Sequence, residues 1–192
     1  MRYLILVRHS QPEIRPNVAG SLWQLSAEGH ARCRLLAEQL SAYQPAAIVA
    51  SVEPKATETA ALLSAHLHMS YQTTEGLHEH ERGNVAYLGR EEWEQTISTF
   101  FAQPDKLVFG NETATQALER FSSAVQRVVK EHEEGNIVIV THATVITLFV
   151  AQHVYIPSFL FWRSLDTPAF VVLSLPSYRL LNTVAKIETP SS

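Results

Sequence analysis

The stretch YLILVRHS, residues 3–10, decides the fold class of this 192-residue chain. Its first five residues are apolar without alternation, which is typical of a short strand that is buried on both faces of a parallel sheet. Polar residues follow at once, so we expect the strand to end at Val7, with Arg8, His9 and Ser10 directly after it. Two further apolar runs of this kind occur at residues 46–50 and 136–140. The sequence therefore predicts three buried strands, each with polar side chains at its carboxyl end.

Helical patterns separate these strands and follow the last of them. They are expected at residues 26–41, 55–66 and 113–134, and after the third strand up to about residue 153. Ser26 is expected to cap the first helix, and Gly135 follows the third, as a glycine often does after a helix. Alternation of strands and helices along a chain indicates an α/β fold.

Weaker patterns complete the expected fold. Short strands are expected at residues 69–73, 170–175 and 178–185, the last two as a hairpin. Residues 74–111 hold glycines, a proline and one expected helix, 90–102, so we expect an excursion over the end of the sheet that carries the site. We predict a single domain over residues 1–192, a three-layer α/β/α sandwich with a mixed, mostly parallel sheet.

The composition argues against several classes of partner. Apolar residues make up 46% and charged residues 18%, which is ordinary for a globular enzyme. A formal net charge of −4 offers no basic surplus for nucleic acid. The most apolar stretch, residues 137–151, is shorter than a membrane span. Cys33 is the only cysteine, which suits a reducing compartment. We predict a cytoplasmic protein with no membrane or nucleic-acid partner.

Polar residues gather where the three buried strands end. Arg8 and His9 follow the first strand, Lys55 comes shortly after the second, and His142 follows the third. Ligands bind at the carboxyl ends of strands in open parallel sheets, so these side chains are expected to converge. Two cations and two neutral imidazoles suit a dianion such as a phosphate monoester. One imidazole can act as a nucleophile while the other stabilises charge on an oxygen.

Five short segments stand at predicted strand ends or helix starts: RHS (8–10), LSAEG (25–29), SVEPKATETA (51–60), LHEHERG (77–83) and THA (141–143). In this order they resemble the Arg-His-Gly, Leu-Thr-x-x-Gly, Ser-x-x-x-Arg-Ala-x-x-Thr-Ala, Leu-x-Glu-x-x-x-Gly and Thr/Ser-His-Gly motifs of the histidine phosphatase superfamily. The family is also called phosphoglycerate mutase-like. The resemblance, which is to its phosphatase branch, extends from residue 2 to about residue 150.

The resemblance implies a role for each matching residue. It makes His9 the phosphorylated nucleophile and Glu79 the group that protonates the leaving oxygen and then activates water. The residues that it implies for phosphate binding are Arg8, Lys55, His142 and Ser10. His142 is expected to serve in catalysis as well. The pattern alone does not distinguish Glu79 from Glu81; only the family motif does.

Several residues depart from the family pattern. Lys55 replaces an arginine and so lacks its planar fork of donors. Arg15 and Arg82 are candidates for a compensating cation by sequence position. Ser10 and Ala143 replace glycines, and Pro12 stands where a threonine is frequent. These changes put the strength of phosphate binding in doubt more than the fold.

Other functions remain open at this stage. His66, His68, His78 and His80 form two His-x-His pairs, which a metal-dependent hydrolase could use. No His-Glu-x-x-His motif, phosphate-binding P-loop or dinucleotide-binding glycine turn occurs in the sequence. Lys55 in place of arginine leaves open a catalytically weak or inactive domain that only binds phosphorylated ligands. A phosphoglycerate mutase-type phosphotransferase is a further alternative.

The sequence-based prediction is a metal-independent phosphomonoester hydrolase without a cofactor. It acts on a small phosphorylated substrate through a phosphohistidine at His9. The identity of the substrate stays open, and so does the oligomeric state, for which a homodimer is one option.

Overall fold

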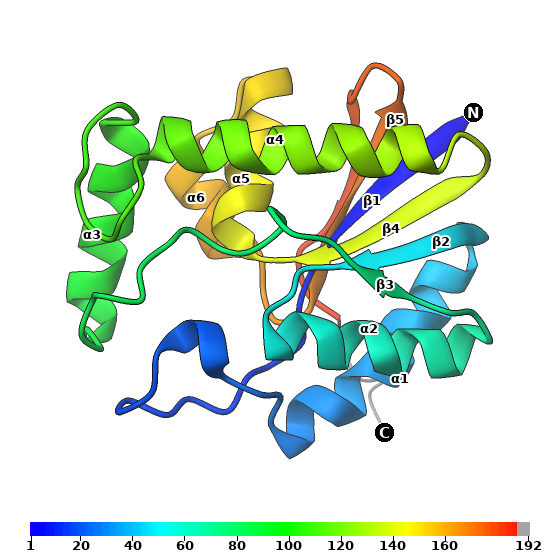
Figure 1. Cartoon of the computed structure of the whole chain (residues 1–192), viewed down its shortest axis with the longest axis horizontal. Helices are drawn as coiled ribbons and strands as arrows, with labels where there is room; N and C mark the ends of the chain where they lie inside the picture. The colour runs from blue at the N-terminus through cyan, green and yellow to red at the C-terminus, as the bar shows by residue number, and fades with distance from the viewer. Residues whose placement is uncertain (188–192) are drawn as a thin grey trace.

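A computed structural model describes residues 1–187 of the chain. Its strands are β1 (Arg2–Arg8), β2 (Pro45–Ala50), β3 (Gln72–Thr73), β4 (Asn136–Thr141), β5 (Ala169–Leu175) and β6 (Leu180–Val184). Its helices are the 3₁₀ turn η1 (Gly20–Leu22), α1 (Ala27–Ser41), α2 (Pro54–Leu67), α3 (Arg90–Ala102), α4 (Ala114–Glu131), α5 (Ala143–His153) and α6 (Ser158–Ser164). Figure 1 shows their arrangement.

The strands form one sheet in the order β3-β2-β4-β1-β5-β6. Strands β3, β2, β4 and β1 run parallel, whereas β5 pairs antiparallel with both β1 and β6. The predicted mixed, mostly parallel sheet is thereby confirmed. Strand β4 lies between β1 and β2, so the three strands with polar carboxyl ends are direct neighbours.

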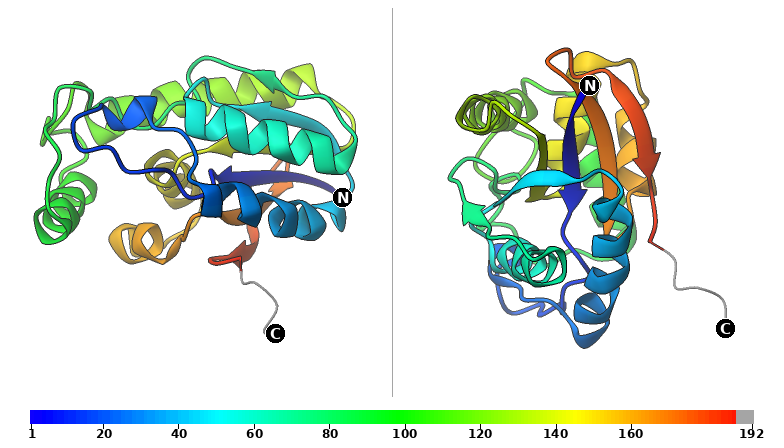
Figure 2. Two further views of the ribbon diagram at one scale, coloured as in Figure 1. Left: turned by 90° about the horizontal axis from the view of Figure 1, so that it is seen from below. Right: turned by 90° about the vertical axis from the view of Figure 1, so that its right-hand side faces the viewer.

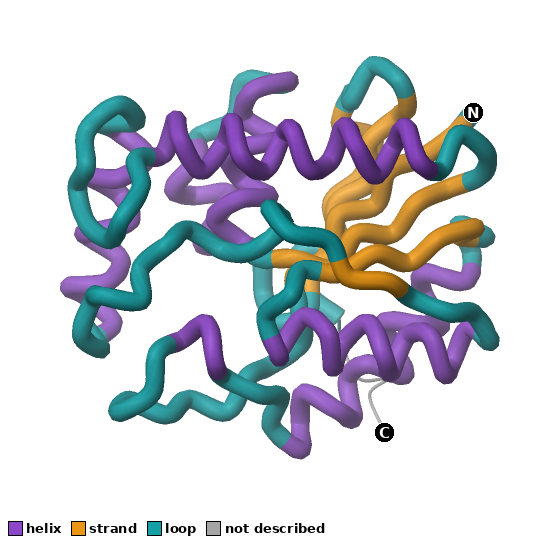
Figure 3. Tube along the Cα trace, viewed as in Figure 1, coloured by secondary structure: helices purple, strands orange, loops and turns teal. Residues whose placement is uncertain are grey.

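Both faces of the sheet are covered by helices (Figure 3). Leu4 and Leu6 of β1 belong to a core shared with α4 and α5, whereas Ile5 and Val7 pack into a core shared with α1 and α2. All four side chains are fully buried. Successive residues of a strand face opposite sides of a sheet, so a continuous apolar run is what a central strand between two helical layers requires.

Helix α1 is fixed to the segment that follows β1. Ser26 caps the helix by accepting a hydrogen bond from the Gly29 N–H at 3.0 Å, and its hydroxyl donates to the Gln11 carbonyl at 3.1 Å. A Cβ at Gly29 would stand 2.1 Å from the carbonyl oxygen of Gln11, so only glycine allows this approach. The LSAEG segment thus fixes the position of Gln11, two residues after His9.

Three elements differ from the sequence-based expectation. Strand β3 has only two residues, and η1 and α6 were not expected. Helix α6 spans seven residues, too few for the apolar periodicity that identifies a helix in a sequence. No helix within residues 1–187 combines the length and apolarity that crossing a membrane requires.

Strand β1 points toward the end of the molecule that carries α3 and the loop after β1 (Figure 2). The carboxyl ends of β2 and β4, which run parallel to β1, face the same end. Helix α3 packs through the buried Phe100 against residues of α4 and α5. The segment between β3 and α3 carries Glu79 past these strand ends.

Candidate active site

Three strand ends bring the predicted site residues together. Arg8 and Thr141 are paired in register across β1 and β4, and the His9 N–H donates to the Thr141 carbonyl at 2.9 Å. His142 therefore lies beside His9, and their ring centroids are 5.2 Å apart. The Ser51 N–H donates to the Val140 carbonyl at 2.9 Å, which joins the end of β2 to the same edge.

His9 is held in one tautomer. Its Nδ1 lies 2.7 Å from the carbonyl oxygen of Ser10, which can only accept, so Nδ1 carries the proton. Nε2 is then left with its lone pair, and no side chain or backbone group of residues 1–187 hydrogen-bonds to it. Burial lowers the pKa of His9 well below its ordinary value, and the neighbouring His142 and Lys55 lower it further. A neutral imidazole with an available Nε2 is the form a nucleophile needs.

His142 is fully buried and occupies the N-cap position of α5. Its Nε2 lies 2.9 Å from the Ser51 hydroxyl and 3.6 Å from a carboxylate oxygen of Glu53. Burial lowers the pKa of His142 well below its ordinary value, and Lys55 adds to the effect. The contact with Glu53 therefore joins a neutral imidazole to a carboxylate. Nδ1 of His142 has no hydrogen-bond partner among the described residues, so in the tautomer in which Nδ1 carries the proton and Nε2 accepts from Ser51 it can donate to a phosphoryl oxygen.

Glu79 is buried, whereas the side chain of Glu81 is 49% exposed and lies 3.3 Å from His78. The Glu79 carboxylate accepts from the His80 N–H at 2.9 Å and from the Thr144 N–H at 3.3 Å. Burial acts to raise the pKa of Glu79, but the charge of Arg82 outweighs it together with other contacts and leaves the pKa below its ordinary value. The geometry thus distinguishes two carboxylates that the sequence pattern leaves equivalent.

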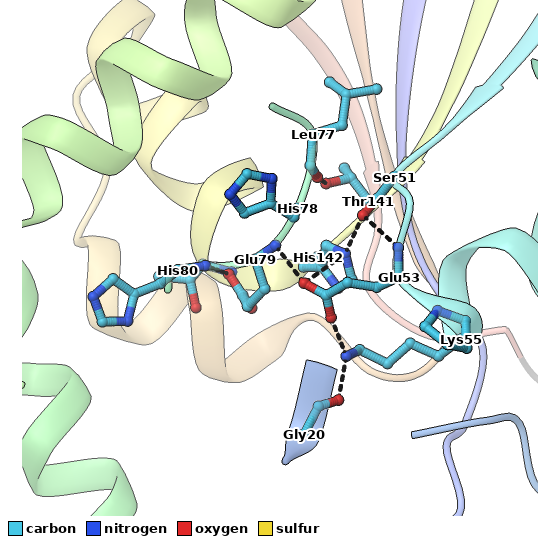
Figure 4. A network of polar contacts seen from close by, with 12 residues as sticks. Gly20, Ser51, Glu53, Lys55, Leu77, His78, Glu79, His80, Thr141 and His142 are labelled. Atoms are coloured by element: carbon cyan, nitrogen blue, oxygen red, sulfur yellow. Dashed lines mark hydrogen bonds and ion pairs between the residues drawn. The ribbon is translucent and has the colours of Figure 1, made fainter. Parts of the chain in front are cut away.

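Lys55 is buried and already engaged. Its ammonium donates to the carbonyl of Gly20 at 2.6 Å and to a carboxylate oxygen of Glu53 (Figure 4). Burial lowers the pKa of Lys55, and Glu53 opposes this effect. The lysine reaches the expected place, but with a counter-ion that the sequence-based prediction does not include.

Arg8 and Ser10 also have partners within the protein. The Arg8 guanidinium donates to the Leu165 carbonyl, and its buried Nε has no hydrogen-bond partner among the described residues. Ser10 donates its hydroxyl to the Gly29 carbonyl at 2.7 Å and its N–H to the Thr59 hydroxyl at 3.0 Å. Both polar donors of Ser10 therefore connect the segment after β1 to helices α1 and α2. The expectation that Ser10 binds phosphate receives no support from this geometry.

Of the two candidate compensating cations, only Arg82 lies at the site. Its guanidinium is 3.9 Å from a Glu79 carboxylate oxygen and stacks over the Trp93 ring at 4.6 Å. Arg15 is half exposed and pairs with Glu13 at 2.5 Å. Arg82 thus adds positive charge next to Glu79, whereas Arg15 is paired at the surface.

A cavity of about 320 Å³ opens beside the start of α2 and the β3–α3 loop, and Arg8, His9 and His142 are not among its lining residues. Glu53, Lys55, Glu79 and Arg82 line it together with Gly20, Ser21, Val52, His78, His80, Glu81, Gly83 and Asn111. The volume is that of a small-ligand pocket, and the lining mixes cations, carboxylates and amides. A small, charged substrate fits such a pocket.

The predicted His-x-His pairs do not meet as a metal site. Within residues 1–187, no group of three or more His, Cys, Asp or Glu side chains is arranged to hold a metal ion. His66 and His68 are exposed at the end of α2, whereas His80 is buried between Phe100 and Phe109 at ring distances of 4.5 Å. The exposed pair His66 and His68 and the pair that contains the buried His80 therefore lie in different surroundings.

Two features of the site were missed by sequence reasoning. Glu53 stands at a strand end two residues before Lys55, so its position alone was a signal for a site residue. Arg120 of α4 donates to the carbonyls of Gly76, His78 and Glu79 at 2.9, 2.9 and 3.2 Å. It also pairs with the buried Glu112 at 2.5 Å. No sequence signal connects Arg120 with residues about forty positions earlier.

Comparison with known proteins places this geometry in a family. No curated protein matches the chain significantly. Similar solved structures include a mycobacterial glucosyl-3-phosphoglycerate phosphatase, with 20% identity, a TM-score of 0.73 and coverage of 98% of this chain and 99% of that one. A phosphoserine phosphatase from Entamoeba histolytica has 16% identity, a TM-score of 0.75 and coverage of 96% and 98%. Bacillus stearothermophilus YhfR has 23% identity, a TM-score of 0.76 and coverage of 96% of each chain.

These structural similarities, at such low identity, establish the fold. A family model gives the stronger statement, because the model of the histidine phosphatase superfamily (branch 1) matches residues 4–180. The matched range includes His9, Glu79 and His142. The chain therefore belongs to branch 1 of the histidine phosphatase superfamily.

Proposed function

We propose that this protein hydrolyses phosphomonoesters in two steps through a phosphohistidine at His9. The observation that carries the proposal is the bond from His9 Nδ1 to the Ser10 carbonyl, which leaves a nucleophilic Nε2 beside His142. The low pKa of His9, caused first by burial, keeps the nitrogen unprotonated near neutral pH. Phosphatase names among the similar structures support the same reaction class.

In the first step, Nε2 of His9 forms a bond to phosphorus as the bond from phosphorus to the ester oxygen breaks. Arg8 and His142 hydrogen-bond the non-bridging oxygens and stabilise the charge that they gain. Lys55 remains a phosphate ligand in the proposal. Gly20 and Glu53 use two of its three N–H donors, and the third is left for the ligand.

Glu79 supplies the proton for the leaving oxygen. The pKa of Glu79 in the empty site is low, so the carboxyl must take up a proton when substrate binds. A phosphate dianion beside the carboxylate raises its pKa, which favours this uptake. In the second step water attacks phosphorus, its proton returns to Glu79, the bond from phosphorus to Nε2 breaks, and phosphate leaves.

Predictions about the substrate, the domain organisation and the location complete the proposal. A cavity of about 320 Å³ with charged walls suits a small phosphorylated substrate. No step of the proposed mechanism draws on a metal or a cofactor. We retain as predictions a single domain over residues 1–192, with residues 74–111 over the site, and a cytoplasmic location.

Turnover of p-nitrophenyl phosphate tests this proposal. We expect His9→Ala to lower kcat by at least about a thousandfold, because the nucleophile is lost. His66→Ala, a matched change of an exposed histidine at the end of α2, should leave kcat unchanged. A chelator should also leave kcat unchanged.

Full activity of His9→Ala would contradict the proposed nucleophile, and loss of activity on chelation would favour the metal-dependent alternative.

One observation favours a second candidate function, a domain that only binds phosphorylated ligands. The ammonium of Lys55 is already paired with Glu53. Tight binding of phosphate with no turnover of any phosphomonoester would support that candidate.

A further inference from the structure

Glu53 and Lys55 form an ion pair inside the proposed phosphate site. Their side chains are only 8% and 6% exposed. The Lys55 ammonium has three donors, of which one is bound by the Glu53 carboxylate and one by the Gly20 carbonyl. Most of the charge that Lys55 brings to the site is therefore balanced before any substrate enters.

The second oxygen of the Glu53 carboxylate faces the catalytic groups. It accepts a hydrogen bond from the Glu79 N–H at 2.8 Å and lies 3.6 Å from Nε2 of His142 (Figure 4). Glu53 thus contacts Lys55, His142 and the backbone of the general acid together. A carboxylate here repels an incoming phosphoryl group while it holds part of the machinery in place.

The charges around the site leave little surplus for a dianion. Arg8 and the neutral His9 face it from the end of β1, Glu53 and Lys55 from the start of α2, and the neutral His142 from the end of β4. The β3–α3 loop contributes Glu79, Glu81, Arg82 and the partly buried His78. Counting the two arginines and the lysine against the three glutamates, cations and carboxylates are equal in number. Uptake of a proton by Glu79 on binding then leaves a surplus of one positive charge, which balances a singly charged phosphate and not a doubly charged one.

We propose that Glu53 is an internal counter-anion that holds the charge of Lys55, weakens phosphate binding and makes the site favour the singly charged form of phosphate. This inference rests on the proposed function, since it concerns the same phosphate site. Coulomb repulsion from Glu53 grows in proportion to the charge of the ligand. The specificity of the site then depends on a carboxylate that the family motif does not specify.

Glu53→Gln separates the charge of Glu53 from its positioning role. The amide oxygen can still accept the Glu79 N–H, whereas the negative charge beside Lys55 is lost. Glu58→Gln is a matched control, because Glu58 lies on the same helix and contacts Leu25 and His30 instead. Both variants change the net charge of the protein by the same amount.

Calorimetric titration with inorganic phosphate measures the effect. We expect Glu53→Gln to bind phosphate at least about tenfold more tightly than the wild type at about pH 8, where the dianion dominates. The gain should be smaller at about pH 6, where the monoanion prevails. Glu58→Gln should match the wild type at both pH values. Unchanged or weaker binding by Glu53→Gln, or an equal gain at both pH values, overturns the proposal.

A double variant keeps the test decisive if Glu53→Gln does not fold. Glu53→Gln combined with Lys55→Met removes both charges and leaves no buried ion unpaired. Because Glu53 balances Lys55, we expect this variant to bind phosphate within about tenfold of the wild type. A larger loss would mean that Lys55 acts on the ligand unhindered by Glu53, and would overturn the proposal.

The outcomes separate this inference from the proposed function. Turnover through His9 together with an unchanged phosphate affinity in Glu53→Gln contradicts the role of Glu53 alone. If neither the wild type nor the variants bind phosphate, the phosphate site itself is contradicted, and with it both proposals.

Discussion

At the scale of single residues, Glu79 has the most demanding task, because it gains or loses a proton at every stage of the proposed cycle. Its carboxylate is buried against the Thr144 and His80 N–H groups, which an amide oxygen can also contact. We expect Glu79→Gln to lower kcat by about a hundredfold to ten-thousandfold, since general acid–base catalysis is removed. The affinity for inorganic phosphate, measured by calorimetry, should not fall, because the change removes a negative charge from the site and none of its phosphate ligands.

Glu75→Gln is the matched control for this variant, since Glu75 lies four residues earlier in the same loop, is exposed and is not among the lining residues of the cavity. Steady-state kinetics should find its kcat close to that of the wild type. An equal loss of kcat in both variants would mean that Glu79 has been wrongly identified as the acid.

The sequence predicted part of the site, and the reason differs from residue to residue. His9 and His142 could be found because a buried strand ends at each of them and parallel strands share an edge. The pairing of Glu53 with Lys55 could not, because it depends on the direction of two side chains at the start of one helix. Phosphate binding by Ser10 was implied by the family resemblance alone and stays a prediction, and in the structure its hydroxyl donates to the Gly29 carbonyl.

At the scale of elements, the start of α1 controls where the chain runs after His9. A Cβ at residue 29 would stand 2.1 Å from a backbone oxygen of Gln11, so backbone must move to admit it. We expect Gly29→Ala to lower the free energy of unfolding by about 1–3 kcal/mol, because the strain falls on backbone rather than on a flexible side chain. Urea-induced unfolding measures this change.

Gly83→Ala is the control, because nothing lies within 4 Å of a Cβ there. Its unfolding free energy should stay within about 0.5 kcal/mol of the wild type. Wild-type stability in Gly29→Ala would disprove the close approach of α1 to the segment after β1.

Arg120 of α4 holds the loop that carries Glu79 in position. The guanidinium of Arg120 donates to three backbone carbonyls of that loop and pairs with the buried Glu112. Lysine keeps the charge but cannot form this set of contacts. We expect Arg120→Lys to lower kcat by about tenfold to a hundredfold, since small displacements of a catalytic group are costly. The affinity for phosphate should be nearly unchanged.

Arg127→Lys provides the comparison, because Arg127 lies on the same helix and donates to the Glu75 carbonyl from an exposed position. Kinetic assays should find this variant close to the wild type. A fall in phosphate affinity as large as the fall in kcat would contradict a role of Arg120 confined to positioning Glu79.

The elements themselves were predictable to different degrees. Strands β1, β2 and β4 each contain a run of apolar residues without alternation. Burial between two helical layers requires this pattern, so the three strands could be predicted. Strand β3 has two exposed residues that pair with Val49 and Ala50, so tertiary pairing rather than composition creates it. Helix α6 is too short to show a period.

At the scale of the whole molecule, the buried neutral histidines connect the site with stability. Burial lowers the pKa of both His9 and His142 in the folded protein, so below about pH 6.5 the unfolded chain binds more protons. Stability is then expected to fall as the pH is lowered below that value, by about 1 kcal/mol per pH unit for each histidine until its folded pKa is reached. Urea midpoints at about pH 7 and about pH 5 measure the slope.

His142→Gln should reduce that slope, because one of the two buried imidazoles is removed. A stability that does not decline between the two pH values would contradict the burial of two neutral histidines in the site.

The central claim is that His9 becomes phosphorylated during turnover, and trapping the intermediate tests it most directly. The protein is mixed with p-nitrophenyl phosphate, quenched in alkali, where phosphohistidine survives, and digested for mass spectrometry. The account predicts a phosphoryl group on the imidazole of His9 in the wild type and none on that peptide in His9→Ala. Turnover that continues with no phosphorylated His9, or with the phosphoryl group on another residue, would contradict it.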